Sequence, residues 1–244
     1  MSHLKIFIDL TRLNKPIGFM LLFWPCSWGL AYAYQVNNDY YLFIFYLLLF
    51  FLGSVLMRSA GCIVNDIVDK NYDKKVKRTK ERPIASGKIT VKHSVYYVII
   101  LCSLAFLILI QFNFFTIILG MSSMFLAFAY PFMKRITYWP QLFLGITFNW
   151  GVIMSWAAMN NSVTPEIILL YVSAIFWTLG YDTIYGAQDM SDDEIIGLKS
   201  TSIKFKKNLK LFVFFSYLAA SVIILYLFRS LSGLNIFSFL IFLF

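Results

Sequence analysis

Charged residues are scarce in this chain. Only 14% of its 244 residues are Asp, Glu, Lys or Arg, whereas 60% are hydrophobic and 19% are aromatic. Soluble globular domains carry about 25% charged residues and roughly 45–50% apolar ones, so this composition excludes an ordinary soluble domain. We therefore predict an all-α integral membrane protein that crosses the bilayer several times.

Cysteine and histidine are also rare, and neither forms a recognisable pattern. Cys26, Cys62 and Cys102 lie far apart in apolar segments without C-x-x-C spacing, which gives no indication of a zinc site or a disulfide framework. His3 and His93 have no partner pattern either. A metal site in this chain is therefore expected to use oxygen ligands.

The amino terminus lacks the marks of a targeting segment. Its first fifteen residues have no apolar core with a cleavage site, as in a signal peptide, and are not Arg- and Ser-rich like a transit peptide. We therefore expect the protein in a bacterial cell inner membrane.

Long apolar runs, by contrast, are abundant. A bilayer core of roughly 30 Å requires about 20 mostly apolar residues per helix. Seven runs of that kind occur, at approximately 16–34, 41–64, 94–111, 114–132, 140–159, 165–187 and 209–228. An eighth begins near Leu234 and reaches only Phe244, which is too short to span, so we expect a truncated eighth helix.

The net charge of +9 follows the loops in alternation. Lys and Arg gather in segments 1–15, 65–93, 133–139 and 188–210, and are absent from the intervening loops near 35–40, 112–113 and 160–164. This distribution is the positive-inside pattern, and it places the amino terminus and the two most basic loops on the cytoplasmic side. It argues against nucleic acid as a partner, and no feature indicates a protein partner.

Two acidic motifs of matching spacing follow the second and the sixth apolar run. They consist of Asp66, Asp69 and Asp73, and of Asp182, Tyr185, Asp189 and Asp193. At about 100° per residue, each set falls on one face of a helix. Carboxylates often only end helices, but like charges stacked on one face repel each other unless a cation compensates them. The pair of motifs therefore favours a metal site.

The second half of the chain loosely repeats the first. Trp28-Gly29 is echoed by Trp150-Gly151, and each acidic motif follows the second apolar run of its half. We predict a single transmembrane domain with an internal repeat of approximately 12–132 and 136–244. An even number of helices between the motifs would place both on the same face of the membrane.

Basic residues accompany the acidic motifs. Carboxylates without His or Cys favour a hard cation, and Mg²⁺ usually binds one or two carboxylates together with phosphate oxygens. The bases next to the motifs are Lys77, Arg78, Lys80, Arg82 and Lys199, whose side chains are suited to clamping phosphate. Other lysines of these loops are better explained as anchors to anionic headgroups. Metal and bases together predict a lipid diphosphate as substrate.

Three further features remain open to two interpretations. Arg58 lies inside an apolar run, where a charge is costly and usually functional. Arg135 ends the fourth run and is either a substrate ligand or a snorkelling anchor. Pro83 and Gly87 break helical structure, so the segment after the first motif is either a lid over the site or a connector.

The motifs resemble those of a known family. NDIVDKNYD with VKRTKERPIASGKIT, and YDTIYGAQDMSDDEIIGLKSTSI, are similar to the two signature regions of the UbiA superfamily of intramembrane prenyltransferases. RLNKPIG, LLFWP, MRSAGC and YPFMKR also resemble segments of these enzymes. The resemblance runs from about Arg12 to Ile203.

This resemblance implies nine transmembrane helices around a central cavity, with Mg²⁺ as cofactor. Carried over by position, Asp69, Asp73, Asp189 and Asp193 match the essential aspartates, Asn65 and Asp66 match the opening of the first motif, and Arg135 matches a substrate-binding position. The residues of the second motif resemble most the family members that transfer a polyprenyl group from polyprenyl diphosphate to 4-hydroxybenzoate in ubiquinone biosynthesis.

The expected chemistry assigns the remaining residues. Mg²⁺ held by Asp66 and the four matched aspartates, with Arg78, Arg82 and Lys199, would help the donor's C1–O bond break. The acceptor ring would attack through the carbon ortho to its hydroxyl. Arg58 or Arg135 would hold its carboxylate, Asp182 is a further substrate-binding candidate, and Tyr185 would orient a carboxylate or a diphosphate oxygen.

Alternative functions remain. One alternative is a prenyltransferase for another acceptor, namely homogentisate, a naphthoate or haem. A transporter could also bind a cation through carboxylates, but it would place them near the membrane midplane, whereas most lie at helix ends here. A truncated and inactive relic is the third alternative.

Overall fold

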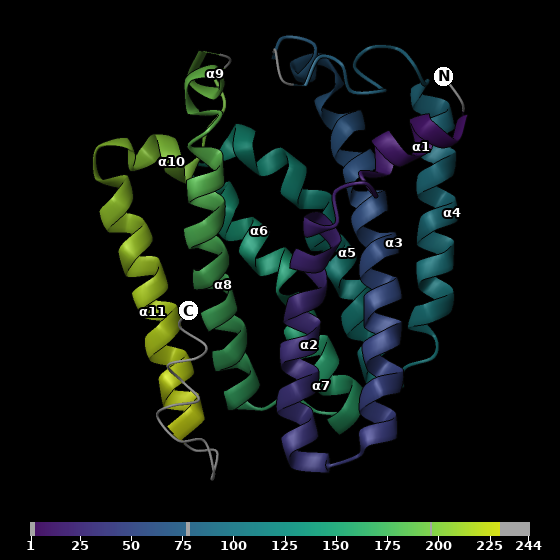
Figure 1. Ribbon diagram of the computed structural model, residues 1–244, viewed down its shortest axis with the longest axis vertical. Helices are drawn as coiled ribbons and strands as arrows, with labels where there is room; N and C mark the ends of the chain where they lie inside the picture. Colours follow the sequence, from purple (N-terminus) through teal and green to yellow (C-terminus); the bar gives the residue numbers. More distant parts are fainter. Residues whose placement is uncertain (1–2, 77–78, 196, 230–244) are drawn as a thin grey trace.

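The computed structural model describes residues 3–76, 79–195 and 197–229, and every regular element within them is a helix (Figure 1). The helices are α1 (His3–Thr11), α2 (Ile17–Asn37), α3 (Tyr40–Asp73), α4 (Val91–Leu109), α5 (Phe114–Ile136), α6 (Pro140–Phe148), α7 (Trp150–Asn160), α8 (Pro165–Gly186), α9 (Met190–Ile195), α10 (Thr201–Lys204), the 3-10 turn η1 (Lys206–Asn208) and α11 (Leu209–Arg229). The all-α fold class is confirmed.

The seven long apolar runs all form helices that are long and apolar enough to cross a membrane. The helix starts follow ordinary capping chemistry: the side chains of Asp39, Thr90 and Asn113 accept hydrogen bonds from backbone N–H groups at the starts of α3, α4 and α5. The eighth run lies outside the described residues.

Helix α3 is longer than a bilayer requires. Its 34 residues extend for about 51 Å, compared with a hydrocarbon core of roughly 30 Å. The last turns of the helix therefore project beyond the apolar span and carry the whole first acidic motif out of it.

The predicted span at 140–159 is interrupted in its middle, at Asn149 between α6 and α7. The buried Asn149 amide nitrogen donates to Gly145 O at 2.8 Å, Ala174 O at 3.1 Å and Thr178 Oγ1 at 2.7 Å. The break thus gains side-chain hydrogen bonds to α8, which compensate a backbone irregularity at membrane depth.

The repeated Trp-Gly pairs lie where α2 and α7 pack most closely. A Cβ atom on Gly29 would be 2.4 Å from the backbone oxygen of Val152, and one on Gly151 would be 2.4 Å from Cys26 Sγ. Small residues at these positions allow the two helices to approach, as is common in membranes. The internal repeat itself stays a prediction.

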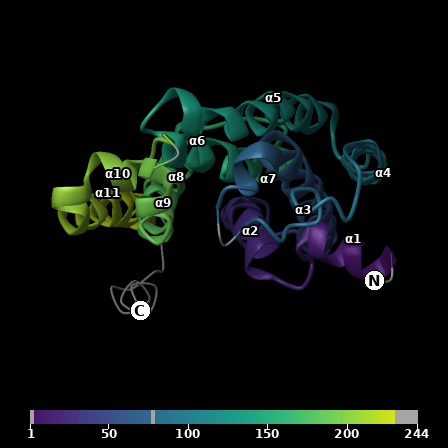
Figure 2. The same cartoon turned by 90° about the horizontal axis from the view of Figure 1, so that it is seen from above.

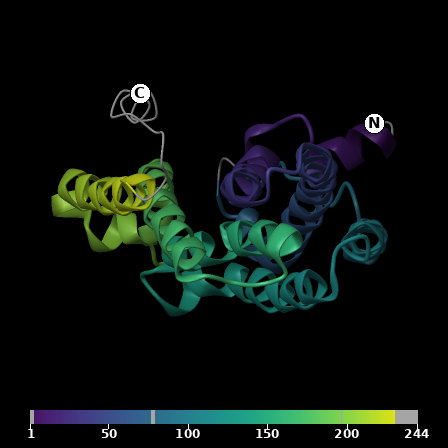
Figure 3. The same cartoon turned by 90° about the horizontal axis from the view of Figure 1, so that it is seen from below.

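The helices form a bundle, seen along its long axis in Figures 2 and 3, with α4 and α11 on opposite sides. Helix α11 packs along α8, where Ser173 Oγ donates to Ala220 O at 2.9 Å. Helix α1, the segment after α3, and α9 all lie at the same end of the bundle (Figure 1). Both acidic motifs therefore open toward one side, as their spacing predicts.

Candidate functional site

A cavity of about 1770 Å³ lies inside the bundle and is lined by residues of every helix from α1 to α8. Its deeper wall is apolar and includes Phe50, Phe112 and Met154. Polar and charged side chains line it toward the end that carries the acidic motifs: Arg12, Asn65, Arg82, Lys134, Asp182 and Tyr185. The cavity is thus suited to a molecule with an apolar tail and an anionic head.

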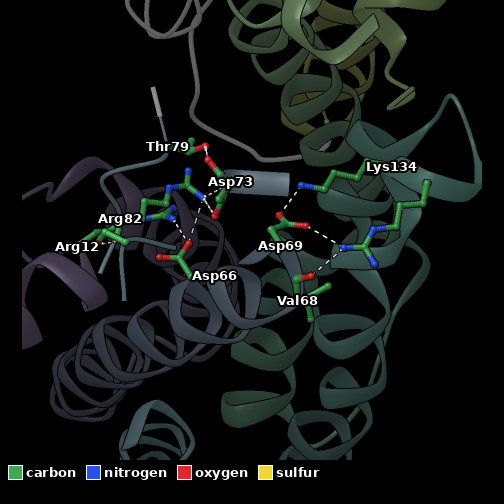
Figure 4. A network of polar contacts seen from close by, with 10 residues as sticks. Arg12, Asp66, Val68, Asp69, Asp73, Thr79, Arg82 and Lys134 are labelled. Atoms are coloured by element: carbon green, nitrogen blue, oxygen red, sulfur yellow. Dashed lines mark hydrogen bonds and ion pairs between the residues drawn. The ribbon is translucent and has the colours of Figure 1, made fainter. Parts of the chain in front are cut away.

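Asp66 and Asp73 of the first motif share one arginine (Figure 4). Nη1 of Arg82 lies 3.1 Å from Asp66 Oδ1 and 2.9 Å from Asp73 Oδ2, and Nη2 of Arg12 lies 2.6 Å from Asp66 Oδ1. Both aspartates are buried. Two guanidinium groups therefore compensate two carboxylates that stand two turns apart on α3.

Asp69 faces another direction, toward α5. Lys134 Nζ donates to Asp69 Oδ2, and Arg135 Nη2 lies 3.1 Å from Oδ1 (Figure 4). Arg135 also donates to Val68 O at 3.0 Å, and its guanidinium lies 4.8 Å from the centre of the Tyr72 ring. The three aspartates thus lie on one helix, as predicted, but Asp69 is bound on a different side from its two neighbours.

Basic side chains separate these carboxylates from the cavity. Arg12, Arg82 and Lys134 line the cavity wall, whereas the described lining residues do not include Asp66, Asp69 or Asp73. Burial of a charge is costly unless a partner stays in place, so the aspartates also fix the orientation of the bases. An anion that enters this end of the cavity meets a positive wall.

Sequence reasoning missed Arg12 and Lys134 as site residues. Their partners on α3 are 54 and 65 positions away, and no periodicity links groups so far apart. The pKa of Arg12 is raised: burial acts to lower it, but Asp66 and neighbouring groups outweigh that effect. The sequence signal for these two residues is that they lie in RLNKPIG and YPFMKR, which resemble segments of known prenyltransferases.

The second motif departs from the predicted single helical face. Helix α8 ends at Gly186, Asp189 lies in the following turn, and Asp193 lies on α9. At the end of the helix the N–H of Ala187 is shared between Thr183 O and Ile184 O, which tightens the last turn. Only the part on α8 keeps the predicted face, and Asp182 and Tyr185 both line the cavity there.

Lys199 does not point to the cavity. Its Nζ donates to Ile136 O at 3.1 Å and lies 5.5 Å from the centre of the Tyr138 ring, and Lys199 is not among the described lining residues. The expectation that it clamps phosphate has no geometric support. Arg78 lies outside the described residues.

Arg58 lies on the cavity wall in the membrane-spanning part of α3, as predicted for a functional charge. Its guanidinium is 5.5 Å from the centre of the Phe148 ring, and its Nε is buried without a hydrogen-bond partner among the described residues. A Cβ atom on Gly18 would come within 3.0 Å of the Arg58 Nε, so α2 confines this side chain closely.

The segment after the first motif is packed onto the bundle. Ile84 is buried against Leu10 and Ile63, and Gly87 has a φ of 77°, a conformation that favours glycine. Glu81, Arg82 and Pro83 line the cavity. The segment therefore forms part of the cavity wall at this end in addition to connecting α3 to α4.

The carboxylates fit a hard cation in part. Asp66 Oδ2 is buried and accepts no hydrogen bond from the described residues, so an oxygen ligand is available. Among these residues, however, no three His, Cys, Asp or Glu side chains form a ready metal cluster. Mg²⁺ usually takes one or two carboxylates and completes its shell with phosphate oxygens and water.

Relatives with assigned names are nearly half identical to this chain over the stretch that aligns. It is 48% identical over 210 residues to "4-hydroxybenzoate polyprenyltransferase, mitochondrial" of Bos taurus, covering 85% of this chain and 56% of that protein. The protein of the same name from Arabidopsis thaliana is 47% identical over 214 residues, covering 87% and 52%. The chain thus spans about half the length of the curated relatives it matches.

These relatives correct the expected location. Both are mitochondrial proteins of eukaryotes, so the prediction of a bacterial cell inner membrane is wrong. The prediction depended on the missing marks of a targeting segment, and that absence does not distinguish the two membranes. The positive-inside pattern identifies only which loops share a side, and it does not name the membrane.

Solved structures and a family model agree with the fold. A UbiA homolog from Aeropyrum pernix K1 has a TM-score of 0.70 at 23% identity, covering 84% of this chain and 76% of that one. A UbiA homolog from Archaeoglobus fulgidus bound to GPP and Mg²⁺ has a TM-score of 0.67 at 15% identity, covering 92% and 78%. The model of the UbiA prenyltransferase family matches residues 22–244. This chain, with its helical bundle and two acidic motifs, therefore belongs to the UbiA prenyltransferase family.

Proposed function

We propose that this protein transfers a polyprenyl group from polyprenyl diphosphate to the ring carbon of 4-hydroxybenzoate ortho to its hydroxyl, with release of diphosphate, as a step of ubiquinone biosynthesis. The observation that carries the proposal is the cavity, which joins a deep apolar wall to a basic end backed by three buried aspartates. The names of the relatives support the acceptor.

The metal would be Mg²⁺, and its ligands would come from Asp66, Asp69, Asp73, Asp189 and Asp193, with one or two carboxylates per ion and phosphate oxygens and water completing the shell. A divalent ion supplies charge that compensates the diphosphate as its bond to carbon breaks. The Archaeoglobus homolog bound to GPP and Mg²⁺ supports this assignment, as does the buried Oδ2 of Asp66, which accepts no hydrogen bond from the described residues.

The diphosphate would bind at Arg12, Arg82 and Lys134, whose side chains line the cavity. Each now contacts an aspartate, and the same donors are suited to phosphate oxygens, which Arg binds in a bidentate fork. When the donor diphosphate arrives, these bases would exchange part of their contact with carboxylates for contact with phosphate.

The acceptor's carboxylate would bind Arg58. Of the two arginines considered from sequence, Arg135 is engaged by Asp69, Val68 O and the Tyr72 ring, and it is not among the described residues that line the cavity. Arg58 lines it and has a buried Nε without a partner among the described residues. A buried donor without a partner favours an anionic ligand.

The reaction exchanges one bond for another. The ring carbon ortho to the hydroxyl forms a bond to C1 of the donor, while the C1–O bond breaks and the diphosphate leaves with the electron pair. The ring then loses its proton and regains aromaticity. Asp182 and Tyr185 line the cavity, and Tyr185 would orient a diphosphate oxygen.

The membrane would be a mitochondrial one, because the relatives with this proposed activity are mitochondrial. Membranes that contain the expressed protein should move label from radiolabelled 4-hydroxybenzoate into the lipid phase when a polyprenyl diphosphate and Mg²⁺ are present. A chelator should stop the transfer, and added Mg²⁺ should restore it.

The same assay separates the alternatives. If the prenyl group is transferred to homogentisate, a naphthoate or haem and not to 4-hydroxybenzoate, the proposed acceptor is wrong. The proposed reaction of the polyprenyl diphosphate would still hold. Absence of transfer to every acceptor, from protein that is inserted in the membrane, would refute the proposed activity.

A further inference from the structure

The segment that carries Asp189 and Asp193 begins and ends at one buried polar junction. It leaves α8 after Gly186 and returns to the bundle at α10. The junction consists of Gln141 at the start of α6, Thr183 on α8, and Thr201 and Ser202 on α10, and all four side chains are buried. Thr183 directly follows Asp182 in the sequence, whereas the other three residues lie outside the stretch that carries the second motif.

Hydrogen bonds connect the members of this junction. The hydroxyls of Thr183 and Thr201 lie 2.7 Å apart, and Ser202 Oγ donates to Thr183 O at 2.7 Å. The Thr201 N–H donates to Gln141 Oε1 at 3.0 Å, which ties α10 to α6 as well. Buried polar groups are costly when unpaired, so such a network specifies one arrangement of the three helices.

The last turn of α8 packs directly on the junction. A Cβ atom on Gly186 would be 2.9 Å from Ser202 Oγ and 3.1 Å from Gln141 Nε2. Gly186 stands three residues before Asp189. The position of the second motif therefore depends on this contact at its near end.

A second tie holds the far end of the segment to α5. The backbone N–H of Lys199 donates to Lys134 O at 2.8 Å, and Lys199 Nζ donates to Ile136 O at 3.1 Å. The side chain of Lys134 in turn binds Asp69. The end of α5 thus contacts the first motif through the Lys134 side chain. It contacts the segment that carries the second motif through the backbone oxygens of Lys134 and Ile136.

We infer that the junction of Gln141, Thr183, Thr201 and Ser202, together with Lys199, positions the second acidic motif opposite the first. The inference rests on the proposed function, in which the two motifs hold one diphosphate–metal complex. These are positioning residues: they act by restricting where Asp189 and Asp193 stand. Lys199 in this role replaces its expected role as a phosphate ligand.

The first test removes one hydroxyl without changing the shape of the side chain. Thr201→Val should raise the half-saturating Mg²⁺ concentration about tenfold, a size typical of lost supporting contacts at a metal site. The KM for 4-hydroxybenzoate should stay unchanged, because Arg58 is untouched. Thr201→Ser keeps the hydroxyl and should restore the wild-type Mg²⁺ requirement.

A second readout needs no catalysis. In protein without metal or substrate, Thr201→Val should speed hydrogen exchange of the backbone amides in 187–195 and 197–198, and Thr201→Ser should not. Thr116→Val is the matched control, because Thr116 is also fully buried but its hydroxyl has no partner among the described residues. It should leave both the exchange of this segment and the Mg²⁺ requirement unchanged.

Lys199→Met tests the same inference if Thr201→Val does not fold. A positioning role predicts faster exchange in the segment and a higher Mg²⁺ requirement with the same KM for the donor. A higher donor KM with unchanged exchange would show instead that Lys199 binds phosphate, and would overturn the inference. Unchanged exchange in both variants would also overturn it, whereas failure of wild-type transfer would count only against the proposed function.

Discussion

Arg82 donates to Asp73 from a single guanidinium nitrogen, which lies 3.1 Å from Oδ1 and 2.9 Å from Oδ2. The same nitrogen is 3.1 Å from Asp66, seven residues earlier on α3. Arg82, which the sequence predicts to bind the phosphate of the substrate, thus also compensates two buried carboxylates.

Replacing Arg82 should affect both donor binding and folding. Arg82→Lys keeps the positive charge but loses the planar fork, so we expect the KM for the polyprenyl diphosphate to rise about tenfold. Arg82→Met should also reduce stability, because loss of one partner leaves buried carboxylates uncompensated, at a cost of up to about 3–5 kcal/mol. Steady-state kinetics and thermal unfolding in detergent measure the two effects. Lys92→Met, which removes an exposed charge on α4, should change neither.

Asp69→Asn should abolish prenyl transfer while the protein still inserts in the membrane. The substitution keeps the shape but removes the charge that holds Lys134 and Arg135, and a lost electrostatic group of this kind costs about 100-fold or more in turnover. Label transfer and the amount of inserted protein should be measured together. Asp192→Asn is the matched control, since Asp192 is exposed on α9. Substantial activity of Asp69→Asn would contradict the role of the first motif.

Arg58→Met should raise the KM for 4-hydroxybenzoate and leave the donor KM unchanged. The reason is that Arg58 lines the apolar part of the site, where its buried Nε is available to an anion. An acceptor without the carboxylate provides the control. With that acceptor the variant and the wild type should be equally active, and a persisting difference would mean that Arg58 does not bind the carboxylate.

Gly18→Ala should weaken acceptor binding through Arg58. The new methyl group would lie 3.0 Å from the Arg58 Nε, so the guanidinium must shift by a few tenths of an ångström. We expect a higher acceptor KM, with a smaller effect than that of Arg58→Met. Gly53→Ala provides the comparison, because Gly53 also lines the cavity and its Cβ would meet nothing within 4 Å. Equal kinetics of the two alanine variants would refute the steric link.

Gly29→Ala should destabilise the bundle. Its Cβ atom would be 2.1 Å from Ser155 Oγ and 2.4 Å from Val152 O, and the backbone oxygen cannot turn away. Overpacking of this kind typically costs about 1–3 kcal/mol, which thermal unfolding in detergent would detect. Gly61→Ala should not destabilise, since open space surrounds that position and alanine favours helix more than glycine does.

Much of the fold follows from the sequence alone. The apolar runs predict the seven spanning helices, because the thickness of the bilayer sets the length of each run regardless of its neighbours. The position of the first motif on α3 follows from helical spacing for the same local reason. The break at Asn149 is different, since its hydrogen bonds go to α8.

The site was predicted in part. Asp182, Tyr185, Asn65, Arg58 and Arg82 were named from sequence, and all of them line the cavity. The metal roles of the aspartates stay a prediction. Lys199 was placed correctly at the end of the second segment, but its direction depends on backbone oxygens of α5 that no local pattern reveals.

An all-helical membrane protein with two acidic motifs at one end can be predicted from the sequence, because hydrophobic length and helical periodicity are local properties of the chain. Which base compensates which carboxylate depends on the packing of the helices. Arg12, Arg82 and Lys134 reach α3 from three separate segments, and Asp69 pairs with bases of α5 whereas Asp66 pairs with Arg12 and Arg82. Pairing between buried charges depends on distances between packed helices, and those distances exist only once the bundle has formed.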